Sequence, residues 1–398
     1  CLVGSEMCIR DRFFINSYFG DNQSIGLLSH IKKRLPYGMD DQWMVFSHYT
    51  ERGWTVDNLW HIFTDFYGGQ YAPLAFLSYL VLYAGFGYDP FYFHMFSLLL
   101  HIGCVCLVWK LISSLLRVHG GVSEKQILYV NFITTLLFAV HPINVEAVAW
   151  ISALKVLLYA FFYLLGLLCY LRYIRTSKIF YYVLTIGCFL CSFWGKEQAV
   201  TFPLALLIVD WFTNRNMKNL EVWSEKMSFL IMAFFFGIIT VLSQGKGPYE
   251  MIFPLYQRLL FGCFALVEYI TKSLLPVNLN FFYPFPIVLG EEPPLHYYLY
   301  PVVLLFLMGW IIAYRNNRYL VFGVLLFLVN LLFSIHLFNM SRHAIVADRY
   351  MYLSYVGIAF LIANGIWWLR KRLSYFKAAL VFLFFYCFFL SVYTFHYT

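Results

Sequence analysis

Long apolar runs separated by short polar stretches dominate the chain. A helix that crosses the roughly 30 Å hydrocarbon core of a bilayer needs about 20 mostly apolar residues. Such runs predict ten membrane helices, near 91–116, 126–140, 154–171, 179–194, 199–212, 227–243, 297–314, 319–338, 350–369 and 376–396. The sequence therefore predicts an all-α fold, a polytopic membrane helix bundle of about 10–11 spans.

Two further apolar segments differ from full spans. The run at 73–85 is short, and the run at 255–276 is interrupted by Arg258, Glu268 and Lys272. Segments of this kind are typical of interfacial or re-entrant helices. We therefore expect interfacial helices in a first outer loop at 31–90.

The expected domain organisation is simple. Residues 1–12 (CLVGSEMCIRDR) are unlike the rest of the chain and resemble translated adapter sequence, so we expect a non-native segment there. Residues 13–398 are expected to form a single membrane domain. No helix-turn-helix repeat of 34 residues is visible, so no tetratricopeptide repeats are expected in this chain.

Composition narrows the function classes. Apolar residues make up 62% of the chain and charged residues only 12%, whereas soluble domains carry roughly 25% charge. An ordinary soluble enzyme and a disordered chain are therefore excluded. Cys188 and Cys191 form a C-x-x-C without a second pair or a nearby histidine, so no metal site is expected.

The formal net charge of +8 is interpreted as a topology signal rather than as a sign of nucleic-acid binding. Connections between the predicted helices alternate between two sides, and the basic residues gather on one of them. They are Arg117, Lys125, Arg172, Arg175, Lys178, Arg215, Lys218, Lys226, Arg315, Arg318, Arg370, Lys371, Arg372 and Lys377. By the positive-inside rule this side is cytoplasmic. We expect an integral protein of the bacterial inner membrane with its functional side facing the periplasm or exterior.

An aspartate doublet opens the first of four charged patches on the outer side. The patches are MDDQW (39–43), HPINVEAVAWISALK (141–155), GKEQAVTFP (195–203) and ADRYMYL (347–353). The adjacent carboxylates of Asp40 and Asp41 repel, so one should titrate high unless a cation or hydroxyl donor is close. A general base needs such tuning; a solvated turn is the alternative.

The other patches supply cations and further acids. His141 and Glu146 flank the start of a new helix, where the alternative is a structural histidine with a helix-dipole partner. Arginine binds phosphate through two parallel hydrogen bonds, and an unpaired lysine is a point charge suited to it. The candidate phosphate ligands are Lys196, Arg342, Arg349, Lys155 and His141, with Glu146, Glu197 and Asp348 as supporting acids.

In their order along the chain, six motifs resemble the membrane domain of the transmembrane and tetratricopeptide-repeat O-mannosyltransferases and their bacterial relatives, within the C-type glycosyltransferase superfamily. The resemblance covers residues 36–370 and rests on MDDQW, YAPLAFLSYL, FAVHPINVEAVAW, KEQAVTFP, LLPVNLNFFYPFP and ADRYMYL. It implies that Asp40 is the catalytic aspartate, with Asp41 second, and that the donor is a polyprenyl-phosphate-linked sugar, mannose in the better-known members. Val156 departs from the pattern, because many relatives have an acid there.

The expected function is an inverting membrane glycosyltransferase. Because a polyprenyl phosphate leaves as a stabilised anion, one base and a few cations suffice. The donor tail would lie in membrane lipid, and the acceptor, protein or glycan, is left open. No cofactor is expected, and a divalent cation on the aspartates is not favoured.

A transporter or flippase for a lipid-linked glycan is the alternative. Transporters place ionisable groups near mid-membrane and often show repeated halves. Here almost every charge lies at a predicted helix end and no internal repeat is visible. An inactive scaffold is a third possibility, disfavoured by the intact aspartates.

Overall fold

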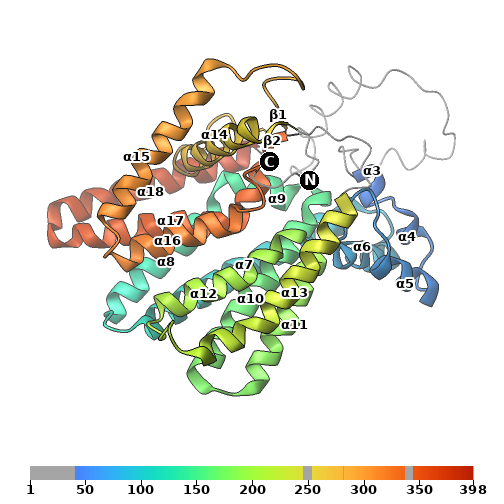
Figure 1. Ribbon diagram of the computed structural model, residues 1–398, viewed down its shortest axis with the longest axis horizontal. Coiled ribbons are helices and arrows are strands. Elements are labelled where there is room, and N and C mark those ends of the chain that lie inside the picture. The colour runs from blue at the N-terminus through green and yellow to red at the C-terminus, as the bar shows by residue number, and fades with distance from the viewer. Residues whose placement is uncertain (1–40, 245–252, 281, 337–343, 398) are drawn as a thin grey trace.

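The computed structural model describes residues 41–244, 253–280, 282–336 and 344–397, which are almost wholly helical (Figure 1). Its α-helices are α3 (Asp41–Met44), α4 (His48–Glu51), α5 (Val56–Thr64), α6 (Pro73–Phe86), α7 (Pro90–His119), α8 (Glu124–Val140), α9 (Val145–Ala149), α10 (Leu154–Thr176), α11 (Ile179–Gly195), α12 (Phe202–Phe212), α13 (Leu220–Gln244), α14 (Leu255–Leu274), α15 (Leu299–Ala313), α16 (Arg318–Leu331), α17 (Met351–Trp368) and α18 (Leu373–Tyr397). Short 3-10 helices are η1 (Pro142–Asn144), η2 (Ile151–Ala153), η3 (Glu197–Thr201), η4 (Leu295–Tyr298), η5 (Asp348–Tyr350) and η6 (Leu369–Lys371). Two strands, β1 (Tyr283–Pro284) and β2 (Ala344–Val346), pair antiparallel.

Each of the ten predicted segments overlaps a helix, although residues 337–338 lie outside the described residues, and the all-α membrane bundle is confirmed. Six described helices are long and apolar enough to cross a bilayer, or seven if α8 and Pro142–Ala149 form one span bent by 53°. The helices α11, α12 and α16 have only 17, 11 and 14 residues. By length and composition, the described residues therefore supply fewer full spans than expected.

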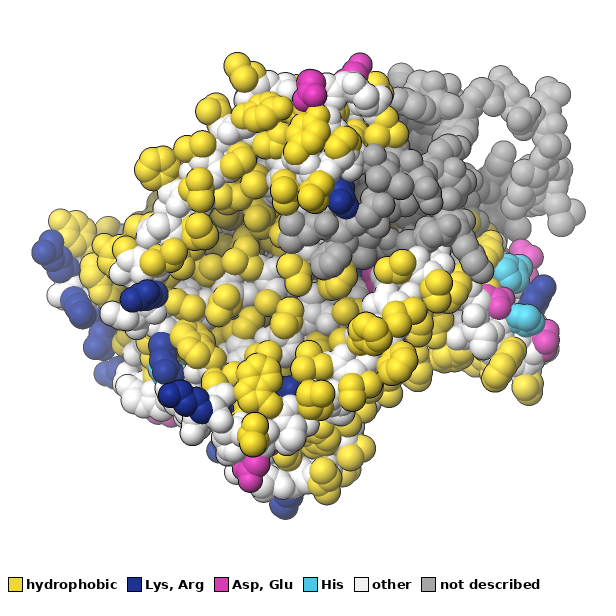
Figure 2. All heavy atoms as spheres, in the orientation of Figure 1, with side chains coloured by type: hydrophobic (Ala, Val, Ile, Leu, Met, Phe, Trp, Pro, Cys, Tyr) yellow, Lys and Arg dark blue, Asp and Glu magenta, His cyan; other side chains and the backbone are white. Residues whose placement is uncertain are grey.

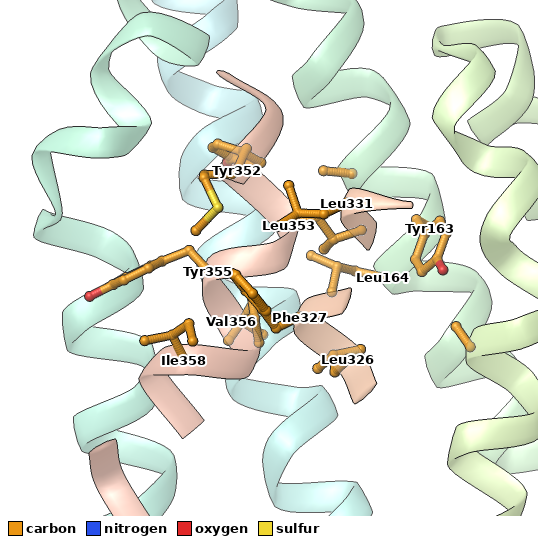
Figure 3. Close-up of a cluster of buried hydrophobic side chains, with 14 of the residues drawn as sticks. Tyr163, Leu164, Leu326, Phe327, Leu331, Tyr352, Leu353, Tyr355, Val356 and Ile358 are labelled. Atoms are coloured by element: carbon orange, nitrogen blue, oxygen red, sulfur yellow. The ribbon is translucent and has the colours of Figure 1, made fainter. Parts of the chain in front are cut away.

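The helices pack as neighbours around a common apolar core. Helix α10 contacts α7 and α11, α8 contacts α7 and α17, and α17 contacts α16. Figure 3 shows the centre of this core, where α10 contributes Tyr163 and Leu164, α16 contributes Leu326, Phe327 and Leu331, and α17 supplies the other labelled residues. These contacts join helices that lie far apart in the sequence.

Two glycines allow α16 and α17 to approach closely. A Cβ atom on Gly357 would lie 2.5 Å from the carbonyl oxygen of Gly323 and 2.8 Å from the nitrogen of Phe327. Small residues at such crossings are characteristic of membrane helix pairs, because packing rather than water exclusion drives association in lipid.

Three of the connections that were predicted to share the basic side lie together. Asn214 Nδ2 donates to the carbonyl of His119 at 3.2 Å, and Arg318 donates to the carbonyl of Trp211 at 3.2 Å. These contacts join the ends of α7 and α12 to the start of α16. In Figure 2 most Lys and Arg side chains on the visible face gather towards the left and lower margins.

At the other end of the bundle, the first outer segment packs on the start of α10. Met44, Val45, Tyr49 and residues of α6 form a second apolar cluster with Ile151 and Leu154. The helices α3 to α6 lie on one side of the molecule in Figure 1. From Asp41 onward, the first outer loop is thus docked against the bundle rather than extended from it.

Candidate functional site

A buried ion pair joins two of the outer motifs. Glu146 lies on α9 and is only 2% exposed, and its Oε2 accepts the main-chain N–H of Arg349 at 2.7 Å. Its Oε1 accepts from the guanidinium of Arg349. The pair fixes η5 against α9, and the positive charge of Arg349 is compensated by Glu146.

Aromatic rings surround the cations at η5. The guanidinium of Arg349 lies 5.1 Å from the ring centre of Trp150 and 5.2 Å from that of Tyr350. Lys196 Nζ lies 4.7 Å from the same Tyr350 ring. Lys196 is 2% exposed and begins the turn that separates α11 from η3. Two predicted phosphate ligands from different motifs therefore share one tyrosine, which attracts cations through its ring face.

Asp41 is held at the start of α10. Its Oδ1 accepts the main-chain N–H of Ser152 at 3.0 Å and also the Ser152 hydroxyl. Both residues are buried. N–H groups at a helix start stabilise a nearby anion, so this contact favours the ionised carboxylate.

Lys155 is a buried ammonium with a neutral partner. Its Nζ donates to Gln70 Oε1 at 2.5 Å, and the lysine is 6% exposed. Across the described ranges, no carboxylate lies within ion-pair distance of Lys155. Burying a charge is costly unless it is paired, so Lys155 is well suited to meet an anion.

A glycine turn presents Gln70 to Lys155. The turn Tyr67–Gln70 closes with a pair of main-chain hydrogen bonds of 3.1 and 3.2 Å. Gly68 has a φ of +59°, and a Cβ atom there would lie 2.6 Å from the ring of Trp43. Only glycine fits both the backbone conformation and the space, which brings the turn close to the segment of Asp41.

Asp348 belongs to a second polar cluster on η5. It is fully buried and accepts from the hydroxyl of Tyr283 at 3.0 and 3.2 Å. The Tyr283 hydroxyl in turn accepts from Lys272 Nζ at 2.8 Å. The pairing of β1 with β2 places Tyr283 beside η5, so the LLPVNLNFFYPFP and ADRYMYL motifs meet here.

The remaining described candidates occupy less informative positions. His141 is 1% exposed; its Nδ1 accepts the N–H of Ile143 at 3.2 Å as a helix cap, and its ring lies 4.2 Å from that of Tyr355. Glu197 begins η3 and is partly exposed. The phosphate-binding role of His141 and the supporting role of Glu197 stay predictions. Asp40 and Arg342 lie outside the described residues.

The first outer loop is tied together by a polar and aromatic cluster. The Tyr49 hydroxyl donates to Asp65 at 3.1 Å, and His61 Nδ1 lies 3.1 Å from the same carboxylate. Burial raises the pKa of Tyr49, with Asp65 adding to the shift. Burial and then Arg52 lower the pKa of His48. The Tyr49 hydroxyl and the His48 imidazole are therefore neutral at neutral pH.

Several residues of the site were not among the candidate residues named from the sequence. Ser152, Gln70, Lys272 and Tyr283 were not predicted, although Tyr283 lies within a recognised motif. Among the described residues, no three His, Cys, Asp or Glu side chains are grouped as a metal ion would require. The expectations about metal and cofactor stay predictions.

Comparisons with known proteins find several protein O-mannosyl-transferases. Protein O-mannosyl-transferase TMTC2 of Mus musculus is 32% identical over 189 residues, which are 43% of this chain and 21% of that protein. Protein O-mannosyl-transferase TMTC4 of Homo sapiens is 31% identical over 167 residues, 37% and 22% of the two chains. Protein O-mannosyl-transferase Tmtc3 of Drosophila melanogaster is 28% identical over 172 residues, 38% and 18%. All three are named protein O-mannosyl-transferases.

These matches support a membrane glycosyltransferase. The chain spans about a fifth of the length of these curated relatives. No family model matches the chain, and no solved structure matches it. With the spans above, the matches support an integral membrane protein similar to these transferases.

Proposed function

We propose that this protein is an inverting glycosyltransferase that moves mannose from a polyprenyl-phosphate carrier to a hydroxyl acceptor on the extracytoplasmic side. The observation that carries the proposal is the meeting of distant motifs at one end of the bundle. Lys196 and Arg349 share the Tyr350 ring, and the segment from Trp150 to Lys155 links them to Asp41. Acids and cations are the two groups that this transfer requires.

The proposed reaction is a single displacement. A carboxylate of the aspartate doublet, Asp40 by resemblance, takes the proton of the acceptor hydroxyl. The hydroxyl oxygen then forms a bond to the anomeric carbon as the bond from that carbon to the phosphate oxygen breaks. Attack opposite to the leaving group inverts the anomeric centre. Polyprenyl phosphate departs as an anion and is received by the cations.

The described cations divide into two roles. Arg349 is compensated by Glu146, so its charge is already paired before a donor binds. Lys155 is buried against a neutral amide, so an incoming phosphate would complete its coordination. We therefore assign Lys155 as the main phosphate ligand, with Lys196 and Arg349 lining the site around Tyr350.

The position of the donor tail and the side of the membrane that the site faces are both inferred from the helix bundle. The donor tail would lie in lipid beside the exposed apolar faces of helices such as α13 and α15, so no soluble nucleotide site is required. The basic loops at the opposite end favour a cytoplasmic location there. We therefore propose that Asp41 faces the outside, which is the periplasm if the membrane is a bacterial inner membrane.

Transfer from a labelled donor tests the proposal. The full chain, reconstituted in vesicles, is given polyprenyl-phosphate [³H]mannose and a panel of serine- and threonine-containing peptides. Label should move to peptide with inversion at the anomeric carbon, and the same donors with glucose or galactose should be poorer substrates. Movement of the lipid-linked sugar across the vesicle without any transfer would instead support the transporter.

A further inference from the structure

Ser152 binds a carboxylate of the first outer loop. It is fully buried, and both its main-chain N–H and its hydroxyl donate to Oδ1 of Asp41, which lies 111 residues earlier. Two donors on one oxygen fix the orientation of the carboxyl group as well as its position. Hydrogen bonds to an ionised acceptor are about twice as strong as neutral ones.

The segment that carries Ser152 is itself firmly placed. The hydroxyl of Tyr79 donates to the carbonyl of Ile151 at 2.8 Å, and all three side chains of η2 are buried. Ile151 packs in the same apolar cluster as Met44 and Val45, which come shortly after Asp41. The hydrogen bonds of Ser152 therefore join η2 to the segment after Asp41, and apolar packing holds these two segments together.

This short segment also touches the cations. Trp150 lies against the guanidinium of Arg349, and Lys155 comes one helical turn after Ser152. Side chains three residues apart lie on one face of a helix. One turn of chain thus sets the spacing between an acid of the doublet and two of the predicted phosphate ligands.

We propose that Ser152 is a positioning residue that holds Asp41, the second aspartate of the doublet, at a fixed distance from the phosphate-binding cations. The inference rests on the proposed function, because the spacing matters only if acid and cations act on one donor. A misplacement of reacting groups by about 1 Å can cost about 100-fold in rate. Ser152 acts through Asp41 and does not itself contact the donor.

Replacing the hydroxyl tests this role. Ser152→Ala keeps the main-chain donor but removes the hydroxyl, and should lower kcat by about tenfold or more, with the donor KM within about twofold. The pH profile should also change, because Asp41 loses a donor that favours its charged form and is adjacent to the proposed base Asp40. Ser152→Thr keeps the hydroxyl and should restore much of the rate.

Ser243→Ala is the matched control. Ser243 is 2% exposed, and its hydroxyl donates to the carbonyl of Thr240 at 2.9 Å. Its loss should leave kcat and the pH profile unchanged. Equal losses in both alanine variants, or a wild-type rate and pH profile for Ser152→Ala, would overturn the inference while leaving the proposed function intact.

A double-variant cycle tests the contact without relying on transfer. Asp41→Ala, Ser152→Ala and the combined variant are compared by thermal unfolding in detergent. The combined loss of stability should be smaller than the sum of the single losses, because the two residues act as a unit. Additive losses would overturn the proposed link. Absence of sugar transfer by the wild-type chain, with the coupling intact, would overturn the proposed function and with it the positioning role.

Discussion

The carboxylate of Glu146 binds both the main-chain nitrogen and the guanidinium of Arg349, 203 residues further along the chain. The pair is almost excluded from solvent, with the side chains 2% and 18% exposed. A buried ion pair is not strongly stabilising in itself, but loss of one partner leaves a buried charge without compensation. Glu146 is therefore a structural determinant of η5.

Glu146→Gln should destabilise the protein by about 3 kcal/mol, because the charge of Arg349 loses its partner. Unfolding of the purified protein in detergent, monitored by heat or denaturant, measures the loss. The matched control is Glu124→Gln, which removes the exposed pair Arg117–Glu124, whose side chains are 57% and 76% exposed. Exposed pairs contribute about 0–1 kcal/mol, so a similar loss in both variants would contradict the prediction.

The charge-balanced variant Glu146→Gln/Arg349→Gln offers a second check. Because it removes both charges, it should recover part of the stability that Glu146→Gln loses. If the loss of stability in the double variant equals the sum of the losses in Glu146→Gln and Arg349→Gln, the two residues do not act as a buried pair.

Lys155→Met should separate function from stability. The ammonium of Lys155 is buried beside a neutral amide, and methionine has a similar length without the desolvation cost of the charge. The unfolding temperature should stay equal or rise, while kcat/KM for the lipid-linked donor falls by about tenfold or more. A variant that is both less stable and fully active would contradict the assignment of Lys155.

Replacing a second buried lysine, Lys226, should lower stability but leave donor binding unchanged. Lys226 Nζ lies 2.6 Å from Oδ2 of Asp210, and both side chains are fully buried at the basic end of the bundle. Arg215 and Glu225 complete this cluster, and the hydrogen bond to Glu225 raises the pKa of Arg215. The group joins the end of α12 to α13.

Lys226→Met should destabilise the protein by about 3–5 kcal/mol, because Asp210 and Glu225 would then share the single positive charge of Arg215. The donor KM of the folded fraction should stay at the wild-type value, since this cluster lies among the basic loops. Thermal unfolding and donor titration together check the prediction. Asp210→Asn/Lys226→Met should regain stability, and a raised donor KM in Lys226→Met would argue that the cluster takes part in donor binding.

The helices were predictable because each apolar run is long enough to stand out from its polar flanks. The predicted run at 199–212 shows the limit of that argument. Lys196 and Pro203 interrupt the chain there, so η3 takes up the first residues and α12 retains only 11. The length of an apolar run does not distinguish a full span from a helix that is broken by a turn.

The site was predictable only where a charge or a motif marked it. Lys196 and Arg349 were expected near one another, and they share the Tyr350 ring. The partner of each charge depends on tertiary packing, and no spacing in the sequence indicates that Glu146 meets Arg349. Ser152 and Gln70 are neutral residues of common types, so their contacts could be found only from the fold.

Asp40→Asn should abolish sugar transfer while expression and donor binding stay near the wild-type level. Asparagine is almost the same size but cannot take the acceptor proton. Asp89→Asn is the matched control, because Asp89 is an exposed cap that accepts the N–H of Phe91 at 3.1 Å and asparagine caps equally well. Radiolabel transfer and donor binding are measured side by side. Near-full transfer by Asp40→Asn would remove this residue from the base role.

Single cysteines at the two ends of the bundle should report opposite sides of the membrane. Lys218 lies in the exposed loop between α12 and α13, among the basic connections, and Glu291 is exposed in the loop that precedes α15. By the positive-inside rule, Glu291→Cys should react with an impermeant maleimide on intact cells, and Lys218→Cys only after the membrane is opened. The native cysteines are replaced first, so that labelling reports the introduced thiol alone. Glu291 precedes α15 and Arg315 follows it, and Arg315 belongs to the same set of basic connections as Lys218. Labelling of Lys218→Cys from outside would therefore put Asp41 and Lys155 on the cytoplasmic side. The acceptor would then have to be a cytoplasmic hydroxyl, although the chemistry at η5 would be unchanged.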